Sequence, residues 1–148
     1  MKKTVFLLIM ITLVFTTSSS AKRVRVFGDV IVTFVEENKE PVWIREDNKK
    51  PKYPSAMAIA NLKGCAVISF DVNAKGRVEN MKALKALPSR KIASEARIAI
   101  RKWNWVNLKS EGDATLESKI VRIDYCIGGS STEESNKLCK QQSERQCK

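Results

Sequence analysis

The sequence predicts an α+β fold, a split β-α-β unit whose three-stranded antiparallel sheet has the order 2-1-3, with two helices on one face. Residues 66–73 and 119–127 alternate apolar and polar side chains, as strands with one buried face do. Residues 77–87 follow the first of these after a short turn, as the return strand of a hairpin. Between the two strand patterns lies a helical apolar stripe, so the crossover should be right-handed.

The first helix is expected to open at Tyr53-Pro54-Ser55, with Ser55 as its N-cap and Gly64 as its stop. Gly76 is expected to serve the hairpin turn after residue 73. Pro88-Ser89 begins the main helix, and its apolar residues are spaced at i, i+4, i+7, i+8 and i+11. They are Ile92, Ala96, Ala99, Ile100 and Trp103. Trp103 is expected in the core, and Trp105 is expected to cover the helix exit.

The first 21 residues have the pattern of an export signal. Lys2 and Lys3 precede an apolar run, and small residues end at Ala21, where cleavage is expected. The run is too short to span a bilayer comfortably as a helix, although an inner-membrane anchor through residues 4–17 is the alternative. We therefore expect a periplasmic protein.

The remaining chain divides into three parts. Residues 22–50 form an extension with strand-like spacing at Val30, Val32 and Phe34, which could add a strand to the sheet. Residues 51–128 form the domain. Residues 129–148 read as a polar tail that cannot build a core of its own.

The chain is strongly basic, with a formal net charge of +11. In a cytosolic protein this excess would indicate nucleic acid. Export removes that expectation, and no aromatic-basic motif restores it. The sequence contains no histidine, so a serine or cysteine nucleophile would lack its usual base, and we expect neither an enzyme, a cofactor nor a small-molecule substrate.

Four cysteines, Cys65, Cys126, Cys139 and Cys147, remain after the signal. An even number in an exported domain favours disulfides, whereas zinc is the weaker alternative because no Cys-x-x-Cys pair is present. Cys65 and Cys126 are expected on the same outward face of neighbouring strands, which predicts a Cys65–Cys126 bridge. Cys139–Cys147 would follow by elimination, unless both lie in one helix.

Residues 51–128 contain an ordered set of motifs, with Phe70-Asp71-Val72, an alanine-rich helix and, at its end, Lys102-Trp103-Asn104-Trp105. By this ordered set, the segment resembles the C-terminal domain of TonB energy transducers. Its scaffold positions are Tyr53, Pro54, Gly64, Gly76, Asn80, Trp103 and Trp105.

The resemblance implies a protein-binding module in TonB-type transport across the Gram-negative cell envelope. In the family, the last strand takes up a short segment of an outer-membrane transporter, as an added strand. Here the implied edge consists of Lys119, Ile120, Val121, Arg122, Ile123, Asp124 and Tyr125. The partner would be an envelope protein such as a TonB-dependent outer-membrane receptor.

The alternative is a stand-alone structural protein of the envelope that keeps the fold without energy transduction. The short leading segment and the lack of a proline-rich spacer before the domain favour it. A homodimer is also left open. If residues 22–50 pair with the last strand, that edge is unavailable for binding.

Overall fold

The computed structural model describes residues 27–36, 40–109 and 115–147. The predicted signal, its cleavage site and the alternative anchor lie outside this part of the chain. Among the residues described, no helix is long and apolar enough to cross a membrane. The elements in chain order are β1 (Gly28–Glu36), β2 (Trp43–Arg45), α1 (Ser55–Ile59), β3 (Gly64–Val72), β4 (Val78–Leu87), α2 (Arg90–Ile100), β5 (Trp105–Asn107), β6 (Glu117–Ile127) and α3 (Thr132–Ser143).

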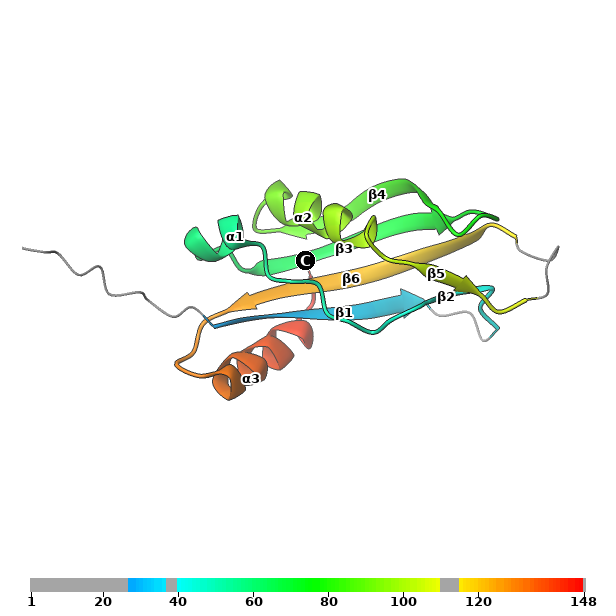
Figure 1. The fold of residues 1–148 in the computed structure, drawn as a ribbon. Coiled ribbons are helices and arrows are strands. Elements are labelled where there is room, and N and C mark those ends of the chain that lie inside the picture. The colour runs from blue at the N-terminus through cyan, green and yellow to red at the C-terminus, as the bar shows by residue number, and fades with distance from the viewer. Residues whose placement is uncertain (1–26, 37–39, 110–114, 148) are drawn as a thin grey trace, which may run out of the picture.

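The predicted α+β class is confirmed, and the possible extra amino-terminal strand is present as β1. An antiparallel sheet has the order β1-β6-β3-β4, and α1 and α2 lie on one face of it (Figure 1). Helix α3 lies on the opposite face, against β6 and β1. The sheet is therefore covered on both faces at one end.

The core lies between the sheet and α2. Alternate residues of β3, from Ala66 to Val72, are buried, as are Val121, Ile123 and Tyr125 of β6. Helix α2 contributes Ile92, Ala93, Ala96 and Ile100. This arrangement follows directly from the two periodicities in the sequence, because period 2 buries one sheet face and period 3.6 buries one helix stripe.

The helix starts differ in part from expectation. The side-chain oxygen of Ser89 accepts a hydrogen bond from the N–H of Lys91 at 3.2 Å, which caps α2. In α1 the capping position is Pro54, and no side chain caps the helix. The prediction that Ser55 is the N-cap is therefore wrong by one residue, because Pro54 holds the extended backbone that precedes the first turn.

A short two-stranded ribbon, β2 with β5, was not predicted. Its strands are three residues long, too short for a periodic pattern to emerge. Trp43 anchors the ribbon: its backbone N–H donates to Glu117 at 2.8 Å, and its indole N–H donates to the carbonyl of Thr115 at 2.9 Å.

The polar tail contains α3, and this changes the predicted disulfides. The bridges are Cys65–Cys147 and Cys126–Cys139, so the expected Cys65–Cys126 and Cys139–Cys147 pairs are wrong. Cys65 lies opposite Asp124 in the β3–β6 register, two positions from Cys126. Both cysteines do face outward, but α3 and the residues after it cover that face, and each bonds to a cysteine of the tail.

Candidate functional site

Strand β6, the predicted binding edge, lies inside the sheet. It pairs with β3 along one side and with β1 along the other, where the register runs from Ile120 to Ile127. The carbonyl of Phe27 accepts a hydrogen bond from the N–H of Gly128 at 2.9 Å. In an antiparallel pair, the backbone N–H and C=O groups of successive residues point alternately to the two sides of the strand. Because Gly128 bonds to the residue before β1, the backbone groups of Arg122, Asp124 and Cys126 also point toward β1, and those of the residues between them point toward β3.

The prediction that residues 119–125 form an open edge is therefore wrong. The chain's own amino-terminal segment takes the neighbouring position, because its apolar side chains complete the core. Val30 is buried, Val32 is partly buried, and the ring of Phe34 lies 6.1 Å from that of Trp103 and 6.2 Å from that of Trp105.

The side chains of the predicted edge are also occupied. Val121, Ile123 and Tyr125 lie in the core, and Lys119 is buried beside Glu117 at 3.1 Å, with Ile120 partly exposed. Burial raises the pKa of the Tyr125 hydroxyl above its usual range, aided by the nearby carboxylate of Glu95 and by Tyr53.

Arg122 and Asp124, expected to flank a docked peptide, form an internal ion pair instead. The guanidinium binds both carboxylate oxygens, at 2.8 and 2.9 Å, and Asp124 is fully buried. Arg122 also donates to the carbonyl of Gln142 in α3 at 3.2 Å. The side-chain amide of Gln142 donates to the carbonyls of Gly64 and Tyr125 at 3.0 and 3.2 Å. Helix α3 thus covers the outward face of the strand.

The sheet has two outer strands, β1 and β4, and they differ as edges. The β4 pairing has two register shifts, a left-handed residue at Asn80, and two lysines, Lys82 and Lys85. Bulges and lysines are the features that keep an edge strand from pairing with another chain. Strand β1 carries no lysine, arginine or proline, and its register is continuous from Gly28 to Phe34.

The outward side of β1 offers backbone groups at alternate residues. The carbonyl of Phe27 points toward β6, at whose end it accepts the N–H of Gly128. The N–H and C=O groups of Gly28, Val30, Val32 and Phe34 therefore point away from β6. The N–H of Val30 donates to the carboxylate of Asp29 at 2.8 Å, and Lys50 bonds the same carboxylate at 2.7 Å. Asp29 and Lys50 therefore cover one end of this edge.

The predicted scaffold residues occupy close contacts around the first helix. The hydroxyl of Tyr53 donates to the carbonyl of Leu62 at 2.6 Å, and burial raises the pKa of Tyr53 to about 12. Pro54 precedes α1. Gly64 is required by packing, because a Cβ there would lie 1.9 Å from the carbonyl oxygen of Leu87.

The remaining scaffold residues support the hairpin and the aromatic cluster. Gly76 adopts a positive φ of 70° in the turn, beside the ring of Trp43. Asn80 donates to the carboxylate of Asp71 at 2.8 Å. Trp105 is buried, whereas Trp103 is partly exposed under the guanidinium of Arg45, so the expected roles of the two tryptophans are nearly exchanged.

The sequence of this chain also matches a known protein family. The family described as the Gram-negative bacterial TonB protein C-terminal domain matches residues 49–127. The chain belongs to this family. The predicted resemblance to TonB is confirmed, as is the prediction that the chain is not an enzyme, since this family consists of interaction modules.

Relatives of the TonB domain are found among curated proteins and solved structures. Protein TonB of Salmonella typhimurium is 36% identical over 82 residues, covering 55% of this chain and 32% of the relative. Protein TonB of Escherichia coli is 32% identical over 56 residues, covering 38% and 23%. The chain thus spans about a third or less of these relatives. The NMR structure of the Pseudomonas aeruginosa TonB C-terminal domain has 21% identity and a TM-score of 0.43, covering 61% of this chain and 86% of that one.

Sequence reasoning left open that the amino-terminal segment pairs with β6, and it missed α3 as the cover of that strand. The first carried a signal, because Val30, Val32 and Phe34 alternate as core-facing residues of a strand do. The sequence of α3 contains almost no apolar pattern of this kind. In α3, among residues whose side chains are described, only Ser135 and Cys139 are buried.

Proposed function

We propose that this chain is a periplasmic TonB-type binding module that captures an extended segment of an envelope protein along the outer edge of β1. Its family supports a TonB-like role in envelope transport, and a TonB-dependent outer-membrane receptor is the partner that the family suggests. The observation that carries the proposal is the contrast between the outer strands, since the register of β1 is continuous from Gly28 to Phe34 and the strand carries no lysine, arginine or proline.

Addition at β1 needs no rearrangement of the core. Taking the place of β1 would instead require breaking its pairing with β6 and removing Phe34 from the aromatic cluster. An incoming strand would bond to the backbone of Val32 and Phe34 directly. At Val30 it would displace the carboxylate of Asp29, which already accepts the N–H there.

The test is NMR titration of the oxidised protein with peptides from the amino-terminal segments of outer-membrane receptors. We expect amide shifts along residues 28–34 and unchanged signals along β4. Val32→Pro removes an outward N–H without removing a bond to β6, and proline is tolerated at such edge positions. We expect it to weaken binding roughly tenfold, the equivalent of about one hydrogen bond.

Val32→Ala is the matched control, because it reduces the same side chain and keeps the N–H. Equal weakening by the two variants would contradict strand addition at β1. If the amide signals of residues 28–34 move to the positions typical of an unstructured chain, the peptide has replaced β1 instead. If no receptor peptide binds, the stand-alone structural protein becomes the better interpretation.

Export itself is tested by intact-mass analysis of protein purified from the periplasm. We expect the mass of a chain that begins at Lys22, reduced by the mass of four hydrogens, two for each disulfide. Retention of residues 1–21 in the membrane fraction would favour the anchor instead.

A further inference from the structure

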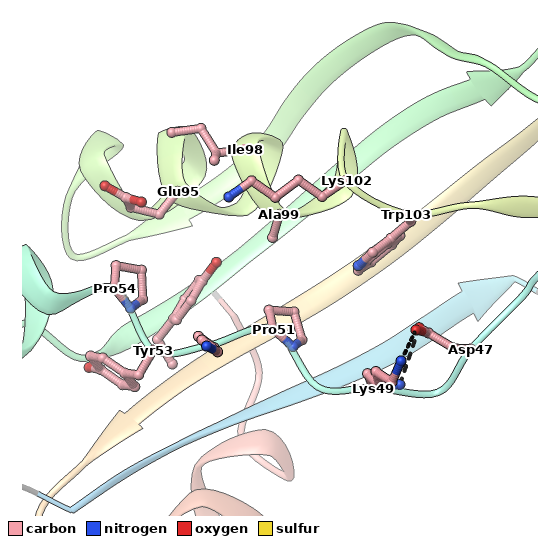
Figure 2. Close-up of a pocket in the computed structure, with 12 residues that line it drawn as sticks. Asp47, Lys49, Pro51, Tyr53, Pro54, Glu95, Ile98, Ala99, Lys102 and Trp103 are labelled. Atoms are coloured by element: carbon pink, nitrogen blue, oxygen red, sulfur yellow. Dashed lines mark hydrogen bonds and ion pairs between the residues drawn. The ribbon is translucent and has the colours of Figure 1, made fainter.

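A cavity of about 430 Å³ lies between α2 and the segment that joins β2 to α1 (Figure 2). Figure 2 shows Pro51 and Pro54 on one side, and Ala99 of α2 together with Trp103, which follows α2, on the other. The lining combines apolar and aromatic side chains with five charged residues, Asp47, Lys49, Lys52, Glu95 and Lys102. Cavities of this size are typical of small-ligand sites. The cavity is distinct from the β1 edge, and its lining includes none of the residues of that strand.

The lining includes a buried tyrosine hydroxyl without a hydrogen-bond partner in the described part of the fold. Tyr125 is 1% exposed, and its hydroxyl oxygen has no hydrogen-bond partner among the residues that the structure describes. The neighbouring tyrosine of the lining is satisfied, because Tyr53 donates to the carbonyl of Leu62. Buried hydroxyls are nearly always paired, so the exception in a cavity wall indicates a group that a ligand completes.

The charges around the cavity favour an anion. Lys49 is paired with Asp47 at 3.4 Å. Lys52 and Lys102 have no ion-pair partner within the described residues, and they outnumber the single remaining carboxylate, Glu95. These two lysines would repel a cationic ligand, whereas they would attract a carboxylate.

We propose that this cavity binds a small carboxylic acid with a flat apolar body. The body would lie against Trp103 and the two prolines, the carboxylate would pair with Lys52 and Lys102, and the hydroxyl of Tyr125 would bond to the ligand. Because the cavity contributes nothing to the pairing at β1, this inference stands or falls independently of the proposed peptide binding.

The experiment compares three probes that share one ring system and differ in charge. Indole-3-acetate, the neutral indole-3-acetamide and the cationic tryptamine are titrated into the oxidised protein and followed by amide shifts. We expect the acetate to bind roughly tenfold more tightly than the acetamide, and tryptamine to bind most weakly. The shifts should centre on residues 98–103.

Two variants separate the charge from the hydroxyl. Lys102→Met keeps the aliphatic stem, so it should reduce the preference for the acetate several-fold and leave the acetamide unchanged. Tyr125→Phe removes only the unpaired hydroxyl, so it should weaken both ligands while the fold is kept. Lys91→Met, at an exposed position of α2 outside the cavity, is the matched control and should change nothing.

Equal affinity for all three probes, shifts away from residues 98–103, or an unchanged acetate preference in Lys102→Met would overturn the proposal. So would tighter binding of an extended peptide that places a tryptophan beside an aspartate, because the cavity would then be a peptide site. Loss of peptide binding at β1 with normal acetate binding would leave the cavity assignment intact.

Discussion

The two faces of the sheet are stabilised by different kinds of interaction. On the α2 face, buried apolar side chains meet an aromatic cluster in which Phe70 lies 5.7 Å from Trp105 and 6.5 Å from Trp103. On the α3 face, the contacts are the Arg122–Asp124 ion pair and the amide of Gln142. The first face is stabilised by removal of apolar surface from water, and the second by covalent bridges and directed polar bonds.

The difference explains how a polar tail becomes ordered. Helix α3 is rich in charged and polar residues, so burial of its side chains alone could not hold it to the sheet. Cys126–Cys139 fixes the helix to β6, and Cys65–Cys147 fixes the residues after it to β3. In this region the crosslinks replace an apolar stripe.

Removing all four cysteines should therefore have the largest effect. On the chain-entropy model the Cys65–Cys147 bridge, with a separation of 82 residues, contributes up to about 4.5 kcal/mol, and the 13-residue Cys126–Cys139 bridge up to about 3 kcal/mol. We expect the quadruple alanine variant to lose roughly 5 kcal/mol in urea unfolding. Hydrogen exchange should show lost protection in α3 first. Protection retained in α3 would contradict the proposed division of the two faces.

Phe70→Ala tests the opposite face. The ring is 1% exposed, and truncating such a buried aromatic costs about 3–5 kcal/mol. We expect urea unfolding to show a loss near 4 kcal/mol while both bridges remain intact by mass. Val35→Ala, at a position that is 55% exposed, should change stability by less than about 0.5 kcal/mol. Comparable losses in the two variants would argue against an apolar origin of stability on this face.

The smallest effect is expected at Asp71, on the polar face beyond α3. Hydrogen bonds from Ser118 and Asn80 lower the pKa of this carboxyl. A lowered folded-state pKa stabilises the fold above the unfolded value of about 3.9, and the contribution is lost as pH falls through the folded value. Melting temperatures from about pH 6 to pH 2 should show a modest advantage over Asp71→Asn that disappears in acid. Ser118→Ala, which removes the shorter bond, should shrink that advantage, and an advantage that grows in acid would contradict the assignment.

The parts of the fold predicted from sequence are those with a periodic apolar pattern. Strand β3, the hairpin and α2 have such patterns, and each lies where its alternation placed it. The β2–β5 ribbon has strands of three residues, and α3 buries mainly Ser135 and Cys139 among its described side chains. Neither presents a period that sequence reasoning can detect.

The candidate site was predicted less well than the fold, because an edge is a property of the whole sheet. The alternation of residues 119–127 shows which side chains face inward, but not which strand lies alongside. The cavity depends on still more distant parts of the chain, since residues 47–54, the end of α2 and Tyr125 form its walls. Because these parts are far apart in the sequence, no local pattern could indicate that they lie together.

The position of Phe34 beside two indoles has a practical consequence. Because its ring lies 6.1 Å from Trp103 and 6.2 Å from Trp105, any event that lifts β1 from the sheet changes what both fluorophores contact. The protein therefore contains an optical reporter of how this strand is seated. Emission spectra could follow it in real time without attaching a dye.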